Sequence, residues 1–166
     1  MSIRLHASAD LAEIARAHLD RAGERVGFFL ADTTPTTFTL SEWRPIADAQ
    51  LLPGRHAVLT DEAVTEIIRW AFTAEAALVE IHSHGPFAPA RFSLIDTDGF
   101  TDWVPGVRWR LRGRPYAAAV IAAGTIDAWA WTDGSGQPQQ VDALVIDNTH
   151  IVPTTRATLE DHHDRQ

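Results

Sequence analysis

The segment Val26–Ala31 is the strongest constraint on the fold, because it contains no polar side chain. A strand that is apolar on both faces has to be covered on both faces. Helical and strand patterns also alternate along the rest of the chain. We therefore expect a single α/β or α+β domain, in which helices flank a central mixed β-sheet.

The expected elements follow from the spacing of apolar residues. One helix is expected over residues 10–22, with Asp10 as its N-cap, and a second begins after Thr60. A short helix is expected to start near Ser93, followed by an irregular segment over residues 99–114. Strands are expected at Val26–Ala31, Phe38–Arg44, His56–Leu59, Ala76–Ile81, Ala117–Ala122, Ile126–Trp131 and Val141–Ile146. The domain is expected to span residues 1–152, and residues 153–166 are expected to form a polar, flexible tail.

Composition and charge exclude several classes of function. The formal net charge of −8 argues against general binding of nucleic acid or of anionic membranes. The chain has no cysteine, so thiolate metal sites and cysteine nucleophiles are excluded and a metal site must use His, Asp or Glu. The N-terminal residues lack a signal-peptide pattern, and no apolar run approaches the roughly 18 residues of a membrane span. A cytoplasmic protein is expected.

His82 and His84 are the candidate metal ligands with the clearest geometry. On an extended strand, residues two positions apart point to the same side, so both imidazoles can face one point. Asp96 lies twelve residues beyond His84, in the expected first turn of the next helix, and can supply a third ligand. Two imidazoles, one carboxylate and an open position suit a catalytic zinc ion.

Hydrolysis at such a centre needs a general base as well as a metal. Glu24 stands at the start of the first apolar strand. Glu80 lies two residues before His82 and shares its face of the strand, but it is expected to be a surface residue and serves only as a substitute. Glu24 could also be a simple exposed residue at the helix end.

The pattern His82-Ser83-His84, then eight residues, then Ser93-Leu94-Ile95-Asp96, resembles the JAMM signature of MPN (also called JAB) domain metalloproteases. The segment from Glu24 to Gly27 is similar to the E-x-x-G element of that family. The resemblance implies that His82, His84 and Asp96 bind zinc. It further implies that Glu24 is the general base and that Ser93 stabilises the oxyanion of the tetrahedral intermediate.

The sequence departs from the family pattern in a few places. The loop after His84 is one residue longer than usual, Gly85 replaces the proline, and Ala31 replaces the glycine that closes the first strand. In addition, Ser-x-x-Asp before a helix is a capping pattern, so Ser93 and Asp96 have a structural alternative that needs no metal.

An alternating run of arginines follows the predicted metal helix. If the segment is extended, its four guanidinium groups share one face, which forms either a solvated edge or a groove for an extended peptide. The candidate substrate-binding residues here are Trp103, Arg108, Trp109 and Arg110. Trp129 and Trp131 share a strand face and are expected in the core.

The expected function is zinc-dependent hydrolysis of a peptide or isopeptide bond. The resemblance implies that the substrate is the C-terminal tail of a ubiquitin-like or sulfur-carrier-like protein, as in compact bacterial members of the family. The alternatives are a non-catalytic MPN-like scaffold that binds a partner, and a metallohydrolase with another substrate. The sequence does not specify an oligomeric state.

Overall fold

The computed structural model describes residues 1–54 and 57–155, which form a curled, mixed sheet of nine strands with three helices. The helices are α1 (Ala9–Leu19), α2 (Asp61–Thr73) and α3 (Leu94–Arg110), and a short 3-10 helix spans Asp48–Gln50. The strands are β1 (Arg4–Ala7), β2 (Val26–Thr33), β3 (Thr37–Pro45), β4 (Ala77–Ser83), β5 (Tyr116–Ala122), β6 (Thr125–Trp131), β7 (Gln139–Gln140), β8 (Ala143–Ile146) and β9 (Thr149–Ile151). Their order in the sheet is β7-β6-β5-β4-β2-β3-β1-β8-β9.

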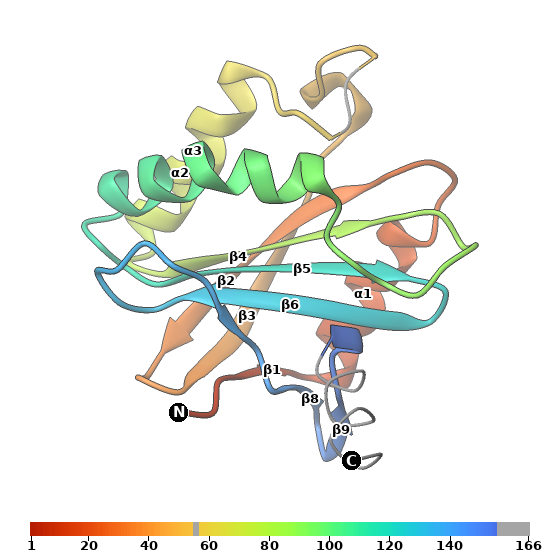
Figure 1. Cartoon of the computed structure of the whole chain (residues 1–166). Helices are drawn as coiled ribbons and strands as arrows, with labels where there is room; N and C mark the ends of the chain where they lie inside the picture. Colours follow the sequence, from red (N-terminus) through yellow and green to blue (C-terminus); the bar gives the residue numbers. More distant parts are fainter. Residues whose placement is uncertain (55–56, 156–166) are drawn as a thin grey trace.

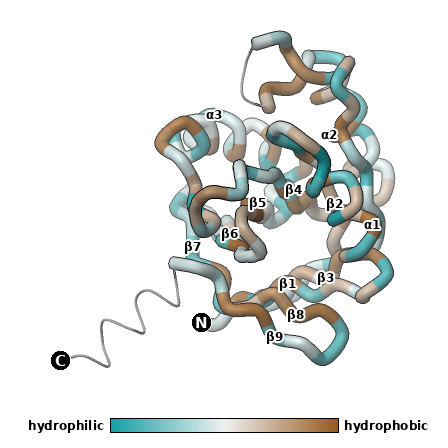
Figure 2. Tube along the Cα trace, turned by 90° about the vertical axis from the view of Figure 1, so that its right-hand side faces the viewer, coloured by the Kyte–Doolittle hydropathy of each residue, from teal (hydrophilic) through white to brown (hydrophobic). Residues whose placement is uncertain are grey.

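Both faces of the central strands are covered, as the apolar run of β2 predicted. Helices α2 and α3 lie over one face of the sheet (Figure 1), where Val26, Phe28 and Leu30 of β2 are buried. The alternate side chains, Phe29 and Ala31, are buried on the other face together with residues of α1. Figure 2 shows the sheet curling from β6 through β4 and β2 round to β1 and β8. The expected α+β class with a mixed central sheet is therefore confirmed.

The connection between β4 and β5 determines where the functional residues meet. The two strands are neighbours and run parallel, so the chain has to cross back over the sheet between them. Helix α3 makes this crossover. Residues 84–93 connect the carboxyl end of β4, where His82 and His84 lie, to the N-terminus of α3.

The expectation of an irregular segment over residues 99–114 is wrong, because α3 continues to Arg110. Pro105 lies inside this helix and has no N–H to donate to the carbonyl of Thr101. Both residues are exposed, so a water molecule can donate a hydrogen bond to that carbonyl instead. Apolar residues at helical spacing hold the helix on the sheet: Phe100, Val104, Val107 and Leu111 are all buried. Tertiary packing thus outweighs the local effect of the proline.

The remaining element boundaries differ in smaller ways. Helix α1 is capped by Ser8 rather than by Asp10, whereas α2 is capped by Thr60 as predicted. Strands β1, β7 and β9 were not predicted. Leu59 forms an isolated bridge with Leu51 instead of a longer strand, and part of the predicted strand at 56–59 lies outside the described residues.

The C-terminal segment is described only to Thr155. Up to that point it contacts the sheet: the hydroxyl of Thr154 donates to the carbonyl of Ile126, and that of Thr155 donates to Asp127. The rest of the predicted tail, residues 156–166, lies outside the described residues. In the part of the chain that is described, no helix has the length and apolar character needed to cross a membrane.

Candidate metal centre

His82 of β4 and His84, which follows the last residue of that strand, face the same point, as the strand spacing predicted. His82 is buried, with 4% of its surface exposed, and His84 is half-buried at the strand end. The backbone N–H of His84 donates to the carbonyl of Ile121 on β5, which keeps the end of β4 extended. The Nε2 atoms of the two rings lie 3.1 Å apart.

Asp96 comes from the first turn of α3, where it also completes a helix cap. The backbone N–H and the hydroxyl of Ser93 donate to Asp96 Oδ2 over 2.7 and 2.8 Å, and the N–H of Asp96 donates to Ser93 Oγ over 3.1 Å. The capping interpretation of Ser93 and Asp96 is therefore correct. It does not exclude the metal interpretation, because the same carboxylate reaches both histidines.

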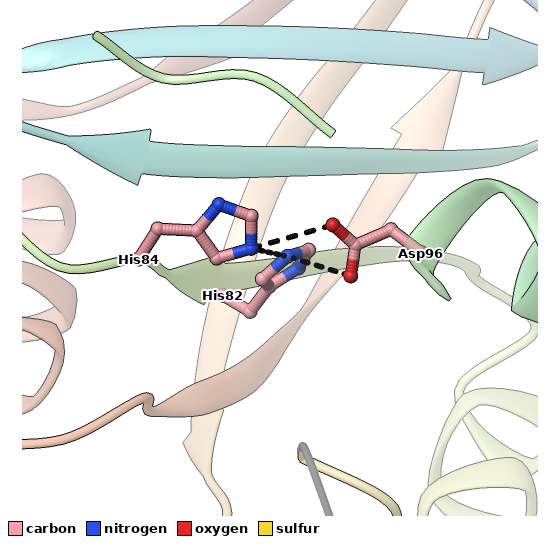
Figure 3. Close-up of side chains that lie close together, drawn as sticks. All are labelled: His82, His84 and Asp96. Carbon is pink, nitrogen blue, oxygen red and sulfur yellow. Dashed lines mark hydrogen bonds and ion pairs between the residues drawn. The ribbon is translucent and has the colours of Figure 1, made fainter. Parts of the chain in front are cut away.

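The donor atoms are spaced as a single tetrahedral ion requires. Asp96 Oδ1 lies 3.3 Å from His82 Nε2, and Asp96 Oδ2 lies 3.3 Å from His84 Nε2 (Figure 3). Two ligand atoms bound at about 2.0–2.1 Å to one tetrahedral ion stand about 3.3–3.4 Å apart. The three side chains offer ligand atoms that all lie within 4.8 Å of one another. They could therefore hold a metal ion.

The carboxylates around His82 raise its basicity. Burial by itself lowers the pKa of His82, but the contact with Asp96 and the negative charges of Asp96 and Glu80 outweigh burial and raise the pKa from 6.5 to about 9. Burial also disfavours the charged form of Asp96 and so raises its pKa. The contact with His82 and the hydrogen bonds from Ser93 outweigh burial and lower the pKa to about 2. In the metal-free protein, His82 and Asp96 therefore form an ion pair at neutral pH, and binding of a metal has to release a proton.

Glu24, the predicted general base, is exposed and lies near the end of β4 that carries the two histidines. Val26 pairs with His82 in antiparallel register, and the N–H of Ser83 donates to the carbonyl of Arg25, so Glu24 falls opposite His84. Residues directly opposite each other in antiparallel strands share a face. Glu24 and His84 both line an open cavity of about 880 Å³, whose lining does not include His82 or Asp96.

Glu80 is not the surface residue that was predicted. Its Oε2 accepts a hydrogen bond of 2.6 Å from the hydroxyl of Tyr116, which is completely buried. Its Oε1 lies 3.7 Å from His82 Nδ1. No sequence pattern indicates this contact, because Tyr116 lies 36 residues away and approaches Glu80 only through the parallel pairing of β4 with β5.

The four candidate substrate-binding residues do not share one face. Trp103 points into the core, where its indole N–H donates to Tyr116, and Arg108 donates to the backbone carbonyls of Gly113, Arg114 and Asp133. Trp109 and Arg110 are exposed. The four guanidinium groups on one extended face do not exist, because Arg108 and Arg110 belong to a helix. Trp109 lies roughly 20 Å along that helix from Asp96.

Comparison with known proteins supports the fold but gives no function. The sequence matches no protein-family model and no curated protein. Among solved structures, this chain is similar to the solution structure of the protein DSY2949 from Desulfitobacterium hafniense, with a TM-score of 0.56 at 13% identity. The similarity covers 86% of this chain and 94% of the other. At this identity it indicates a shared fold and nothing more.

Proposed function

We propose that this chain is a metal-dependent hydrolase that binds zinc through His82, His84 and Asp96 and cleaves peptide or isopeptide bonds. The observation that carries the proposal is the convergence of two imidazole nitrogens and one carboxylate on a single point. Three protein ligands with one position left open is the arrangement of catalytic rather than structural zinc sites. When bound there, zinc would lower the pKa of a water ligand and polarise a carbonyl group.

The surrounding residues have separate roles in this proposal. Glu24 takes a proton from the attacking water and returns it to the leaving amine. Its exposure and its position beside the end of β4 support that role, because a base that exchanges protons with substrate has to be accessible. Ser93 holds Asp96 in position through its hydroxyl. It can donate to an oxyanion only if that hydroxyl turns away from Asp96.

The surface beside the centre favours a protein substrate over a small molecule. Phe87, Leu94 and Ile95 are 97%, 83% and 62% exposed, and they come from the loop and helix turn that lie between His84 and Asp96. Exposed apolar side chains gathered at one place are typical of interaction surfaces. Together with the JAMM-like residue pattern, they support the C-terminal tail of a ubiquitin-like or sulfur-carrier-like protein as the substrate.

Measurement of bound metal and of cleavage in the same preparations tests the proposal. Wild type is expected to carry about one equivalent of zinc and to cleave a ubiquitin-like fusion at its C-terminal tail. His84→Ala is expected to lose both properties, whereas Glu24→Ala keeps the metal and loses cleavage. Matched controls are His150→Ala and Glu13→Ala, which change exposed residues of β9 and α1.

Each contrary result has a distinct meaning. Wild type with no more zinc than His84→Ala contradicts the metal centre. Full activity of Glu24→Ala contradicts the base assignment. A protein that carries zinc and binds the fusion without cleaving it is the non-catalytic scaffold.

A further inference from the structure

A chain of hydrogen bonds runs from α3 through β5 to β4, directly behind the candidate metal centre. The indole N–H of Trp103 donates to the Tyr116 hydroxyl oxygen over 2.7 Å, and the Tyr116 hydroxyl donates to Glu80 Oε2 over 2.6 Å. Tyr116 is 0% exposed, and its burial and the nearby Glu80 raise its pKa well above the ordinary value. The hydroxyl therefore keeps its proton and acts as a donor to Glu80.

The direction of this chain is fixed by chemistry. An indole nitrogen can only donate, so the Tyr116 oxygen accepts from Trp103 and its single proton has to go to Glu80. One oxygen of Glu80 is thereby occupied by Tyr116. The other oxygen, Oε1, is left to face His82.

His82 offers the group that this free oxygen needs. Its Nε2 faces His84 and Asp96, and its Nδ1 is buried without a hydrogen-bond partner among the described residues. Glu80 Oε1 lies 3.7 Å from Nδ1, so a movement of less than about 1 Å brings the pair to hydrogen-bond distance. In metal sites, the second nitrogen of a ligating histidine commonly donates to a carboxylate, which fixes the tautomer and orients the ring.

We propose that Glu80 is a positioning residue that accepts the Nδ1 proton of His82 and leaves the Nε2 lone pair free for the metal. Tyr116 and Trp103 hold Glu80 in the orientation that this requires. The inference rests on the proposed metal centre for its purpose, but the hydrogen bond itself can be tested without metal.

Helix α3 then supports the centre at two places. Trp103 follows Asp96 by seven residues, which is close to two helical turns, so both side chains project from the same face of the helix. One face of α3 thus supplies a ligand through Asp96 and, through Trp103 and Tyr116, the support for another ligand. Displacement of this helix would disturb both.

The Glu80→Gln variant gives a sharp test, because an amide has only one acceptor oxygen. With Tyr116 donating to that oxygen, the amide NH₂ group faces His82 Nδ1 and favours the tautomer with the proton on Nε2. The lone pair needed by the metal is then lost. We expect zinc affinity, measured by competition with a chelator, to fall 10–100-fold.

Removal of the Tyr116 hydroxyl should partly reverse this loss. In Glu80→Gln combined with Tyr116→Phe, the amide is free to turn its oxygen toward His82, so zinc affinity should recover at least severalfold relative to Glu80→Gln alone. Trp103→Phe alone should weaken zinc binding less than Glu80→Gln does. Trp129→Phe is the matched control, because Trp129 is half-buried in the same aromatic cluster, and it should leave zinc affinity unchanged.

Nitrogen NMR of the metal-free protein separates this inference from the proposed function. At alkaline pH the imidazole is neutral, and Glu80 at Nδ1 competes with Asp96 at Nε2 for its single proton. The fraction of His82 that carries the proton on Nδ1 should therefore be larger in wild type than in Glu80→Gln. The same fraction in both proteins, or equal zinc affinity in both, would overturn the inference while leaving the metal centre intact. The expected tautomer change in a wild-type protein that binds no zinc would instead support the inference and refute the metal proposal.

Discussion

Asp96 accepts hydrogen bonds from Ser93 at the start of α3 and also faces both histidines. Substitution can separate the two roles. Asp96→Asn keeps a side-chain oxygen for the cap, so we expect it to bind no zinc and to lose only the stability that the ion pair with His82 contributes. Ser93→Ala removes the cap and should cost about 1 kcal/mol of stability. Metal analysis with thermal denaturation checks both, and stoichiometric zinc in Asp96→Asn would remove Asp96 from the ligand set.

The ion pair between His82 and Asp96 predicts a pH dependence of stability for the metal-free protein. The pKa of His82 is raised from 6.5 to about 9, so its contribution is complete below pH 6.5 and is lost as pH rises toward 9. The pKa of Asp96 is lowered from 3.8 to about 2, so its contribution is complete above pH 3.8 and is lost as pH falls toward 2. The stability difference between wild type and Asp96→Asn should therefore peak between these limits in EDTA-treated samples. A difference that is flat across pH would contradict the ion pair.

Strand β2 and helix α3 respond differently to the addition of a methyl group at glycine. A Cβ atom at Gly27 would collide with the indole ring of Trp43, whereas a Cβ at Gly99 in α3 meets nothing within 4 Å. Gly27→Ala should destabilise the protein by about 1–3 kcal/mol, because a ring packed against backbone cannot yield easily. Gly99→Ala should stabilise it by about 0.5–1 kcal/mol. Urea denaturation measures both, and equal effects would contradict the close approach of Trp43 to β2.

At the level of elements, sequence patterns predicted the features that depend on residues close to one another in the sequence. The alternation along β4 correctly placed His82 and His84 on one face, and the Ser93 capping pattern located the start of α3. The length of α3 could not be predicted, because Pro105 disfavours a helix locally and only packing on the sheet holds it. The contact between Glu80 and Tyr116 depends on the parallel pairing of two strands, which no local pattern specifies.

For the molecule as a whole, the exposed apolar side chains of Phe87, Leu94 and Ile95 beside the candidate metal centre predict that the substrate is a folded protein rather than a short peptide. Phe87→Ser should raise KM for a folded ubiquitin-like fusion about tenfold and leave cleavage of a short peptide unchanged, because only the fusion has a folded part that the exposed ring can contact. Trp109→Ala, at the far end of α3, serves as the comparison. Equal losses on both substrates in Phe87→Ser would show that Phe87 supports the loop rather than binding a protein partner.

Strand β1 lies between β3 and β8, so the sheet joins residues from opposite ends of the described chain. Leu5 pairs with Phe38 on one side and with Leu144 on the other, and the N–H of Ile3 donates to the carboxylate of Asp142. During synthesis on the ribosome, β1 emerges first but can complete its pairing only after β8 has left the exit tunnel. Until then the nascent chain carries an open strand edge. Newly made copies are therefore most prone to associate with one another during that interval.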